Sequence, residues 1–422
     1  MTRADSEKPA LLGGPKAVTL DATEANRWPI ITEEDEAAVL QVLRHGDLSQ
    51  HPVTRQLEDD YRAYFGRRHA LAHCNGTAAL LAAFFALDLE PGDEVLVPSA
   101  TFWASVVPML WVGALPVFCE SEPDRLGLDP EDVARKITPR TRAMVVVHLW
   151  GMPSRMSELF EIAERHKLKI IEDASHAQGA TWRGRKCGTL GDISVFSLQG
   201  SKLAPAGEGG IFLTDNDALM ERATCLGDIS RIIELPTPAR RFAATSFGIK
   251  TRIAPLSAAV ARVQLRHLPE RNRRRDDNLR YLSERLERLG FDTFLPPNHV
   301  HRVYFEFLIR HHPERSGLPA DTLLEALRAE GCDIELPRYP LVHQQPIFTE
   351  GHFASIARLE GRGDIDLPTY RPDALPRTDA ANRNLIKLPN FPSAERDLLD
   401  QYARAFEKVI AHAPQIAAAP RG

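Results

Sequence analysis

Cysteine is scarce in this sequence and follows no paired pattern. The 422 residues include five cysteines, widely spread and without a C-x-x-C step: Cys74, Cys119, Cys187, Cys225 and Cys332. This spacing argues against a zinc site and against a disulfide framework, and it suits a reducing compartment. We therefore predict no metal site and a cytoplasmic location.

Long apolar runs and an excess of positive charge are also absent. No run of about eighteen apolar residues occurs, so we expect no segment to span a bilayer. The N-terminal stretch MTRADSEKPALLGGP lacks the apolar core of a secretory signal. The net charge of −5 gives no electrostatic reason to expect nucleic acid or an anionic membrane as a partner.

What the sequence does contain is an alternation of short apolar runs and helix-length segments. The runs are rich in Val, Ile, Leu or Phe and lie at 94–98, 116–119, 143–149, 168–172, 193–197 and 210–214. Helical patterns cover 33–45, 53–65, 77–87 and 157–166. This alternation predicts an α/β domain whose largely parallel sheet is covered on both faces.

The rest of the chain predicts an arm, a bridging helix and a smaller domain. From about Leu265 leucines recur at helical spacing among interleaved acids and arginines, which favours a long solvated helix over a nucleic-acid site. The predicted units are an arm at 1–30, a large domain at 31–275, a small α+β domain at 276–412 and a flexible tail at 413–422.

One lysine stands in unusual surroundings, in the stretch FSLQGSKLAPAGEGG. Lys202 is flanked by small, apolar and glycine residues, with Ser197 shortly before it and a glycine-rich turn after it. A solvated surface lysine is rarely placed in this way. The stretch follows an apolar run, so we expect the amine near one edge of the sheet.

An acid and a histidine follow another apolar run, in IIEDASHAQGA. Asp173 stands where a strand is expected to end, at the edge where open α/β sheets bind ligands. A single acid there often caps a loop, and a single histidine such as His176 is more often a loop or core residue. The alternative is that Asp173 pairs with a cationic ring nitrogen and His176 contacts the same ligand.

Two further motifs supply an anion site and an aromatic wall. In HCNGTAALL, Gly76 and Thr77 open a helix whose free N–H groups suit a phosphate, although a simple N-cap at Asn75 or Thr77 explains the step as well. In PSATFWAS, Phe102 and Trp103 follow a strand end, where a ring can stack on a flat cofactor or pack in the core.

Together these motifs place a carboxylate, an aromatic wall, an anion site and an amine near one sheet edge. Pyridoxal 5'-phosphate requires all four. Its aldehyde condenses with a lysine amine, its ring nitrogen pairs with a carboxylate, and its phosphate needs N–H and hydroxyl donors. The sequence therefore predicts a site for this cofactor.

The motifs NGTAAL, PSATF, IIEDASHAQGA, VFSLQGSK and GEGG resemble, in order and spacing, those of the DegT/DnrJ/StrS aminotransferases, which act on keto sugars and cyclitols. The resemblance runs from about Trp28 to Ala411. It implies fold type I, the aspartate aminotransferase-like α/β fold, with a mostly parallel seven-stranded sheet. It also implies a homodimer with shared active sites.

The resemblance implies roles for the matching positions. Lys202 would form the Schiff base with the cofactor and move a proton, with pyridoxamine 5'-phosphate as the intermediate cofactor form. Asp173 would pair with the ring nitrogen, Phe102 would stack on the ring, and His176 would lie near the ring hydroxyl. The phosphate would be held by Gly76, Thr77 and Ser197.

In this family an asparagine of the partner subunit completes the phosphate site, in a G-x-N-x-R segment. Here the segment reads FGIKTRIAPLSAAVARVQL, so Lys250 occupies the asparagine position and can bind phosphate as a point charge. This form, together with LLGGPKAV and RWPIITEEDE, resembles the glutamine:scyllo-inosose branch. The candidates for substrate contacts are Arg252, Tyr339 and His343.

The implied reaction moves an amino group from L-glutamine or L-glutamate to a cyclitol ketone in aminoglycoside-type antibiotic biosynthesis. A nucleotide-linked keto sugar is the alternative acceptor. A cofactor-binding regulator without turnover would also keep the pocket, but Lys202 and Asp173 are both intact. A Rossmann oxidoreductase would need G-x-G-x-x-G after the first strand, which the sequence lacks there.

Overall fold

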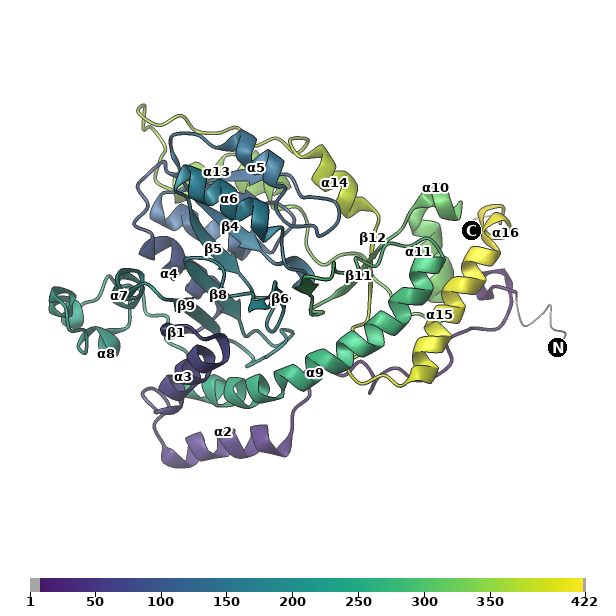
Figure 1. Ribbon diagram of the computed structural model, residues 1–422, viewed down its shortest axis with the longest axis horizontal. Coiled ribbons are helices and arrows are strands. Elements are labelled where there is room, and N and C mark those ends of the chain that lie inside the picture. Colours follow the sequence, from purple (N-terminus) through teal and green to yellow (C-terminus); the bar gives the residue numbers. More distant parts are fainter. Residues whose placement is uncertain (1–7, 420–422) are drawn as a thin grey trace.

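The computed structural model describes residues 8–419 (Figure 1). At its centre lies a seven-stranded sheet with the strand order β1-β9-β8-β5-β4-β2-β3, in which only β9 runs antiparallel to its neighbours. The strands are β1 (His69–His73), β2 (Glu94–Pro98), β3 (Leu115–Cys119), β4 (Thr141–Val147), β5 (Lys169–Asp173), β8 (Ile193–Ser197) and β9 (Gly210–Thr214). The predicted α/β fold with a mostly parallel sheet is confirmed.

Helices cover this sheet because its strands are apolar on both faces. β2 and β9 are buried along their whole length. α4 packs against β8 and β9, and α3 packs against β1. Each fully buried Leu or Phe of this core, such as Phe84, contributes roughly 1.5–3 kcal/mol. The helices before α9 are α2 (Glu33–His45), α3 (Val53–Phe65), α4 (Gly76–Ala86), α5 (Pro130–Lys136), α6 (Met156–His166), α7 (Asp217–Cys225) and α8 (Ile229–Ile232).

Element ends that carry explicit signals lie where the sequence predicts them. α2 follows a capping box formed by Thr32 and Asp35, and it ends at Gly46 with φ 83°. β1 was not predicted, because HALAH is short and mixes histidines with apolar residues. The structure buries Leu71 in this strand and pairs it with β9.

The charged segment forms one helix, α9 (Pro255–Arg288), which extends from the large domain to the small domain (Figure 1). Leu268 packs in the core of the large domain, whereas Leu279 and Leu282 pack in the core of the small domain. The predicted domain boundary after residue 275 therefore falls inside a helix. No helix in the described part of the chain, α9 included, is long and apolar enough to cross a membrane.

The small domain has its own sheet and apolar core. β11 (Phe307–Arg310) pairs antiparallel with β12 (Leu385–Leu388). The segment from Val342 to Leu375 packs instead against the core of the large domain. The remaining strands and α-helices are β6 (Thr181–Trp182), β7 (Arg185–Lys186), β10 (Val300–His301), α10 (Pro313–Ser316), α11 (Ala320–Ala329), α12 (Pro346–Thr349), α13 (His352–Ile356), α14 (Pro376–Arg383), α15 (Arg396–Ala411) and α16 (Ala413–Ala417).

Both ends of the described chain pack against the small domain. Glu330 accepts a hydrogen bond from the N–H of Ala17 at 2.9 Å, and Val18 is buried in the small-domain core. The predicted flexible tail at 413–422 begins instead with α16, because Ile416 is buried in the same core. Parts of the predicted arm and tail, residues 1–7 and 420–422, lie outside the described residues.

Candidate active site

A cavity of about 770 Å³ lies at the carboxyl edge of the parallel strands. Asp173 is the last residue of β5, Ser197 is the last residue of β8, and Gly76 opens the helix that follows β1. Carboxyl ends of parallel strands meet at one edge of a sheet, which is where open α/β sheets bind ligands. The cavity brings together these predicted site residues: Gly76, Thr77, Phe102, Asp173, His176, Ser197, Lys202 and Tyr339.

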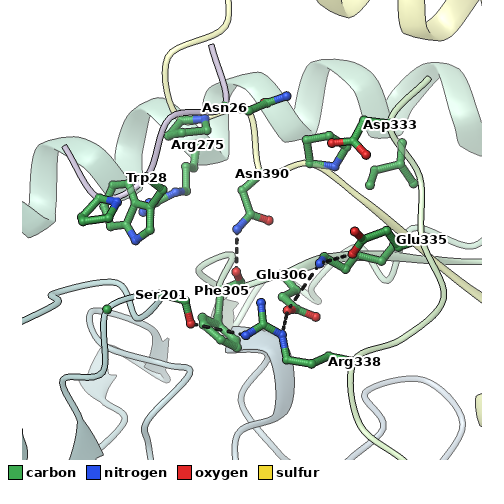
Figure 2. A pocket seen from close by; sticks show the side chains of 16 residues that line it. Asn26, Trp28, Ser201, Arg275, Phe305, Glu306, Asp333, Glu335, Arg338 and Asn390 are labelled. Atoms are coloured by element: carbon green, nitrogen blue, oxygen red, sulfur yellow. Dashed lines mark hydrogen bonds and ion pairs between the residues drawn. The ribbon is translucent and has the colours of Figure 1, made fainter. Parts of the chain in front are cut away.

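Lys202 lines the cavity from the loop after β8 and is only 7% exposed. Its N–H donates to the Gln199 carbonyl at 2.8 Å, and its own carbonyl accepts from Trp28 Nε1 at 3.0 Å. The Nζ atom lies 4.1 Å from the ring centroid of Phe305, which is labelled in Figure 2. Burial lowers the pKa of Lys202 to about 8, although the Asp173 carboxylate opposes this shift. The amine is therefore partly neutral around neutral pH, as a nucleophile and proton carrier must be.

Asp173 presents a buried carboxylate that two hydrogen bonds hold in place. Ser105 Oγ donates to Oδ2 at 2.7 Å, and the Ser175 N–H donates to Oδ1 at 3.1 Å. Ser105 Oγ also lies 2.9 Å from Thr101 Oγ1, so the serine is itself fixed. A carboxylate held this way is suited to pair with a cationic ring nitrogen.

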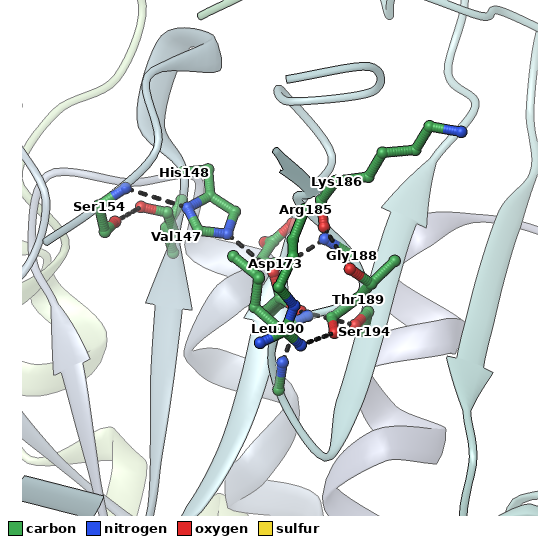
Figure 3. Close-up of polar contacts among 12 residues, drawn as sticks. Val147, His148, Ser154, Asp173, Arg185, Lys186, Gly188, Thr189, Leu190 and Ser194 are labelled. Carbon is green, nitrogen blue, oxygen red and sulfur yellow. Dashed lines mark hydrogen bonds and ion pairs between the residues drawn. The ribbon is translucent and has the colours of Figure 1, made fainter. Parts of the chain in front are cut away.

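The end of β5 is anchored by a buried network around Glu172, next in sequence to Asp173. His148 Nε2 lies 2.9 Å from the Glu172 carboxylate, which also accepts from the N–H groups of Gly188 and Leu190 and from Ser194 Oγ. Figure 3 shows His148 on one side of this strand end and the 188–194 loop on the other. Burial disfavours the charge of Glu172, but His148 and the N–H donors outweigh it and lower the pKa of this carboxyl.

The start of α4 presents backbone N–H groups next to Ser197, as an anion site requires. The N–H groups of Gly76 and Thr77 are in the first turn, where a helix supplies no acceptors of its own. Asn75 caps the same helix, since its Oδ1 accepts from the Ala78 N–H at 2.8 Å. A Cβ on Gly76 would lie 2.8 Å from Ser197 Cβ, so only glycine fits without displacement. The Asn75 cap therefore occupies the Ala78 N–H and leaves those of Gly76 and Thr77 to an anion.

Aromatic rings form the walls of the cavity. The buried His176 ring stacks on Phe305 with centroids 4.2 Å apart, and Tyr339 stacks on Trp150 at 5.0 Å. Phe102 is 38% exposed, and its centroid lies 5.5 Å from that of Tyr339. Burial lowers the pKa of His176 well below its ordinary value, so the imidazole is neutral. A flat ligand thus meets apolar rings and a neutral hydrogen-bonding group.

These residues fit pyridoxal 5'-phosphate. When bound, the cofactor supplies an aldehyde for the lysine amine and a ring that accepts an electron pair. Lys202 would hold it covalently, and Asp173 would keep its ring nitrogen protonated. The phosphate would lie at the first turn of α4, against Gly76 and Thr77.

Three predicted residues lie outside the cavity of their own chain. Lys250 is exposed, and Arg252 lines a separate groove. The buried ring of His343 has Nδ1 2.6 Å from Ser99 Oγ and Nε2 3.1 Å from the Pro372 carbonyl. In this arrangement His343 holds two loops together and does not line the cavity.

Sequence reasoning missed several residues of the site. Ser105 follows the predicted aromatic pair, but its bond to Asp173 depends on the packing of two strands. Arg338 lines the cavity directly before Tyr339, in a segment already singled out. Its only sequence signal is that position.

The comparisons with known proteins agree with this site. The sequence model of the DegT/DnrJ/EryC1/StrS aminotransferase family matches residues 29–407. A provisionally named L-glutamine:3-amino-2,3-dideoxy-scyllo-inosose aminotransferase of Streptoalloteichus tenebrarius is 33% identical over 351 residues, which are 81% of this chain and 82% of that protein.

Solved structures show the same fold over nearly the whole chain. DesV of S. venezuelae is 32% identical, covers 94% of this chain and 99% of its own, and superposes with a TM-score of 0.76. DesI, solved with its TDP-sugar product, is 29% identical over 98% of both chains, with a TM-score of 0.79. The chain belongs to the DegT/DnrJ/EryC1/StrS aminotransferase family and is a pyridoxal-phosphate-dependent aminotransferase of fold type I.

Proposed function

We propose that this enzyme moves an amino group from L-glutamine or L-glutamate to a ketone on a cyclitol. The observation that carries the transfer chemistry is the convergence of Lys202, Asp173 and the start of α4 on one cavity. In each half-reaction Lys202, released from the cofactor, would carry a proton between the reacting carbon of the substrate and the cofactor. Its lowered pKa suits both steps.

The cyclitol acceptor is supported by the S. tenebrarius relative, whose name specifies an amino-dideoxy-scyllo-inosose. A nucleotide-linked keto sugar is the second candidate, because DesI was solved with a TDP-sugar product. A role in aminoglycoside-type antibiotic biosynthesis follows from the first candidate and is part of the proposal.

We further propose a homodimer whose two sites each use Lys250 of the partner. Figure 1 shows α7 and α8 projecting from the large domain, and the chain from α8 to Lys250 exposes large apolar side chains. These are Ile229, Ile233, Phe247 and Ile249. Exposed apolar side chains concentrated in one segment are typical of protein interfaces. The exposed Lys250 follows them directly and is free of its own cavity.

The proposal is tested by an acceptor screen. The cofactor-loaded enzyme is incubated with glutamine or glutamate and with scyllo-inosose, 2-deoxy-scyllo-inosose or TDP-linked keto sugars, and aminated products are measured by mass spectrometry. We expect amination of a free cyclitol ketone. Amination of TDP-linked sugars alone would favour the second candidate, and a cofactor absorbance band that neither glutamine nor glutamate changes would contradict a transferase.

A further inference from the structure

The amino donor of the proposed function carries an α-carboxylate, which needs a cationic partner in the cavity. Among the described residues that line the cavity, the only Lys or Arg side chains are Lys202 and Arg338. Lys202 is committed to the cofactor, and the lining acids Asp173 and Glu208 would repel a carboxylate. Arg338 is thus the one guanidinium that the cavity's own chain offers to the donor, and Arg252 of the partner subunit, two residues after Lys250, is the competitor from the proposed dimer.

The guanidinium of Arg338 is only partly engaged by its own chain. Its Nε lies 2.6 Å from Glu306 Oε1, and its Nη1 makes a long contact of 3.4 Å with Ser201 Oγ (Figure 2). In the described part of the chain, Nη2 has no hydrogen-bond partner. The side chain is 40% exposed. Arg338 therefore keeps donors for a ligand while Glu306 fixes its direction.

Arg338 stands between the active-site cavity and a second chamber of about 480 Å³. Ser201 and Arg338 line both the cavity and the chamber, whereas Glu306 and Arg275 line the chamber but not the cavity. The guanidinium thus has room on each side. Its charge is felt at the reacting end of the cavity, because it adds to the effect of burial in lowering the pKa of Lys202 and of His176.

We propose that Arg338 binds the α-carboxylate of the amino donor through its Nη groups while Glu306 holds its Nε. This inference rests on the proposed function for the identity of the ligand. A carboxylate and a guanidinium form short, charge-assisted hydrogen bonds of defined geometry. After the keto acid leaves, the same N–H donors suit the hydroxyl groups of a neutral cyclitol.

A second arginine is the alternative position for the carboxylate. Arg275 is buried against Trp28, with its guanidinium carbon 3.9 Å from the ring centroid, and its Nε and Nη1 have no hydrogen-bond partner in the described chain. It lines the chamber but not the cavity of Lys202. We therefore assign the α-carboxylate to Arg338, and the experiment below includes Arg275 as the competitor.

The first experiment measures binding without reaction. 4-Carbamoylbutanoate, which is glutamine without its amino group, is titrated calorimetrically into the cofactor-loaded enzyme. We expect Arg338→Gln to weaken binding about 10- to 100-fold and Arg338→Lys to weaken it less, as is usual for charged hydrogen bonds. Arg362→Gln is the matched control, because Arg362 is exposed, pairs only with Asp364 among the described residues, and lines neither space. Equal affinity in Arg338→Gln and wild type, or a loss confined to Arg275→Gln or to Arg252→Gln, would overturn the assignment.

The second experiment separates the two half-reactions by stopped-flow absorbance. Arg338→Gln should slow the half-reaction with glutamine about 100-fold, through KM more than kcat, and should change the reverse half-reaction with a carboxylate-free aminocyclitol only a few-fold. Equal losses in both directions would indicate a merely structural role and would contradict the inference. If the wild-type enzyme transaminates nothing, the proposed function fails, and the calorimetry still decides whether Arg338 is a carboxylate site.

Discussion

Glu172 and Glu306 are both buried, at 0% and 1% exposure, but their surroundings differ sharply. The Glu172 carboxylate accepts hydrogen bonds from backbone N–H groups and Ser194, and it pairs with His148. Glu306 has only ionic neighbours on Oε1, with Arg338 Nε at 2.6 Å and Lys387 Nζ at 3.9 Å. Within the described chain, its Oε2 has no partner.

The pKa directions of the two carboxyls follow from this difference. Hydrogen-bond donors and His148 outweigh burial and lower the pKa of Glu172, whereas burial dominates and raises the pKa of Glu306. A fully satisfied network keeps one geometry. Glu306 instead leaves Oε2 without a hydrogen-bond partner in the described chain, and it pairs with Arg338, which also lines the active-site cavity.

The largest expected effect is on stability, at Glu172, whose carboxylate is fully hydrogen-bonded. Glu172→Gln removes the charge opposite His148 and turns an amide NH₂ toward N–H donors, so we expect the free energy of unfolding to fall by about 3–5 kcal/mol. Equilibrium urea unfolding measures this loss. An unchanged midpoint would show that the network does not anchor β5.

The matched substitution Glu306→Gln should change the free energy of unfolding at pH 7 by no more than about 1 kcal/mol, because its partner Arg338 is 40% exposed and the pair is screened by solvent. Because burial raises the pKa of Glu306, the folded wild type binds more protons than the unfolded chain between the unfolded pKa of about 4.3 and the raised folded pKa. Wild-type stability is therefore lost as pH rises through the folded pKa, and Glu306→Gln lacks this loss. A difference between the two proteins that shrinks as pH rises would contradict the comparison.

Gly76→Ala tests the first turn of α4, where we expect the cofactor phosphate to bind. The new Cβ would lie 2.8 Å from Ser197 Cβ and would crowd the first turn of α4. We expect about 1–3 kcal/mol weaker cofactor binding, as overpacking typically costs. Fluorescence titration of the apo-protein with pyridoxal 5'-phosphate measures it, and unchanged affinity would place the phosphate elsewhere.

Phe102→Leu tests the exposed side of the cavity. The ring is partly exposed and has space beside Tyr339, so its loss should leave stability unchanged within about 0.5 kcal/mol. Cofactor affinity should fall up to roughly tenfold, the usual worth of one aromatic stack. An affinity equal to that of wild type would mean that Phe102 does not stack on the cofactor.

The smallest expected effect is a shift in the pKa of Lys202. Condensation with pyridoxal 5'-phosphate needs the neutral amine, so its rate in the apo-protein should rise with pH with a midpoint at about 8. Arg338 helps to lower the pKa of Lys202, and Arg338→Gln should therefore move the midpoint upward. A downward shift would contradict the placement of that charge.

How far the sequence predicts this molecule depends on whether a feature is local. The strands β2, β8 and β9 were predicted with their correct bounds, because apolar runs between turn residues specify buried strands. The carboxyl-edge site followed from them, since Asp173 and Lys202 each come after such a run. Arg338 could not be predicted as part of the cavity, because only tertiary packing brings it to Lys202.

His343 shows the same limit in the other direction. It stands in a segment that matches the family, but Ser99 and Pro372 occupy its ring nitrogens. Arg252 lines a different groove of its own chain, and its role toward a partner's site stays a prediction. A motif specifies where a segment folds more reliably than which way each side chain points.

The account depends most on the covalent bond at Lys202. Cofactor-loaded protein is reduced with borohydride, digested and analysed by mass spectrometry. The account predicts a single pyridoxyl adduct, on the peptide that contains Lys202, and none in Lys202→Ala. An adduct on another lysine, or no adduct in protein that retains the cofactor, would contradict it.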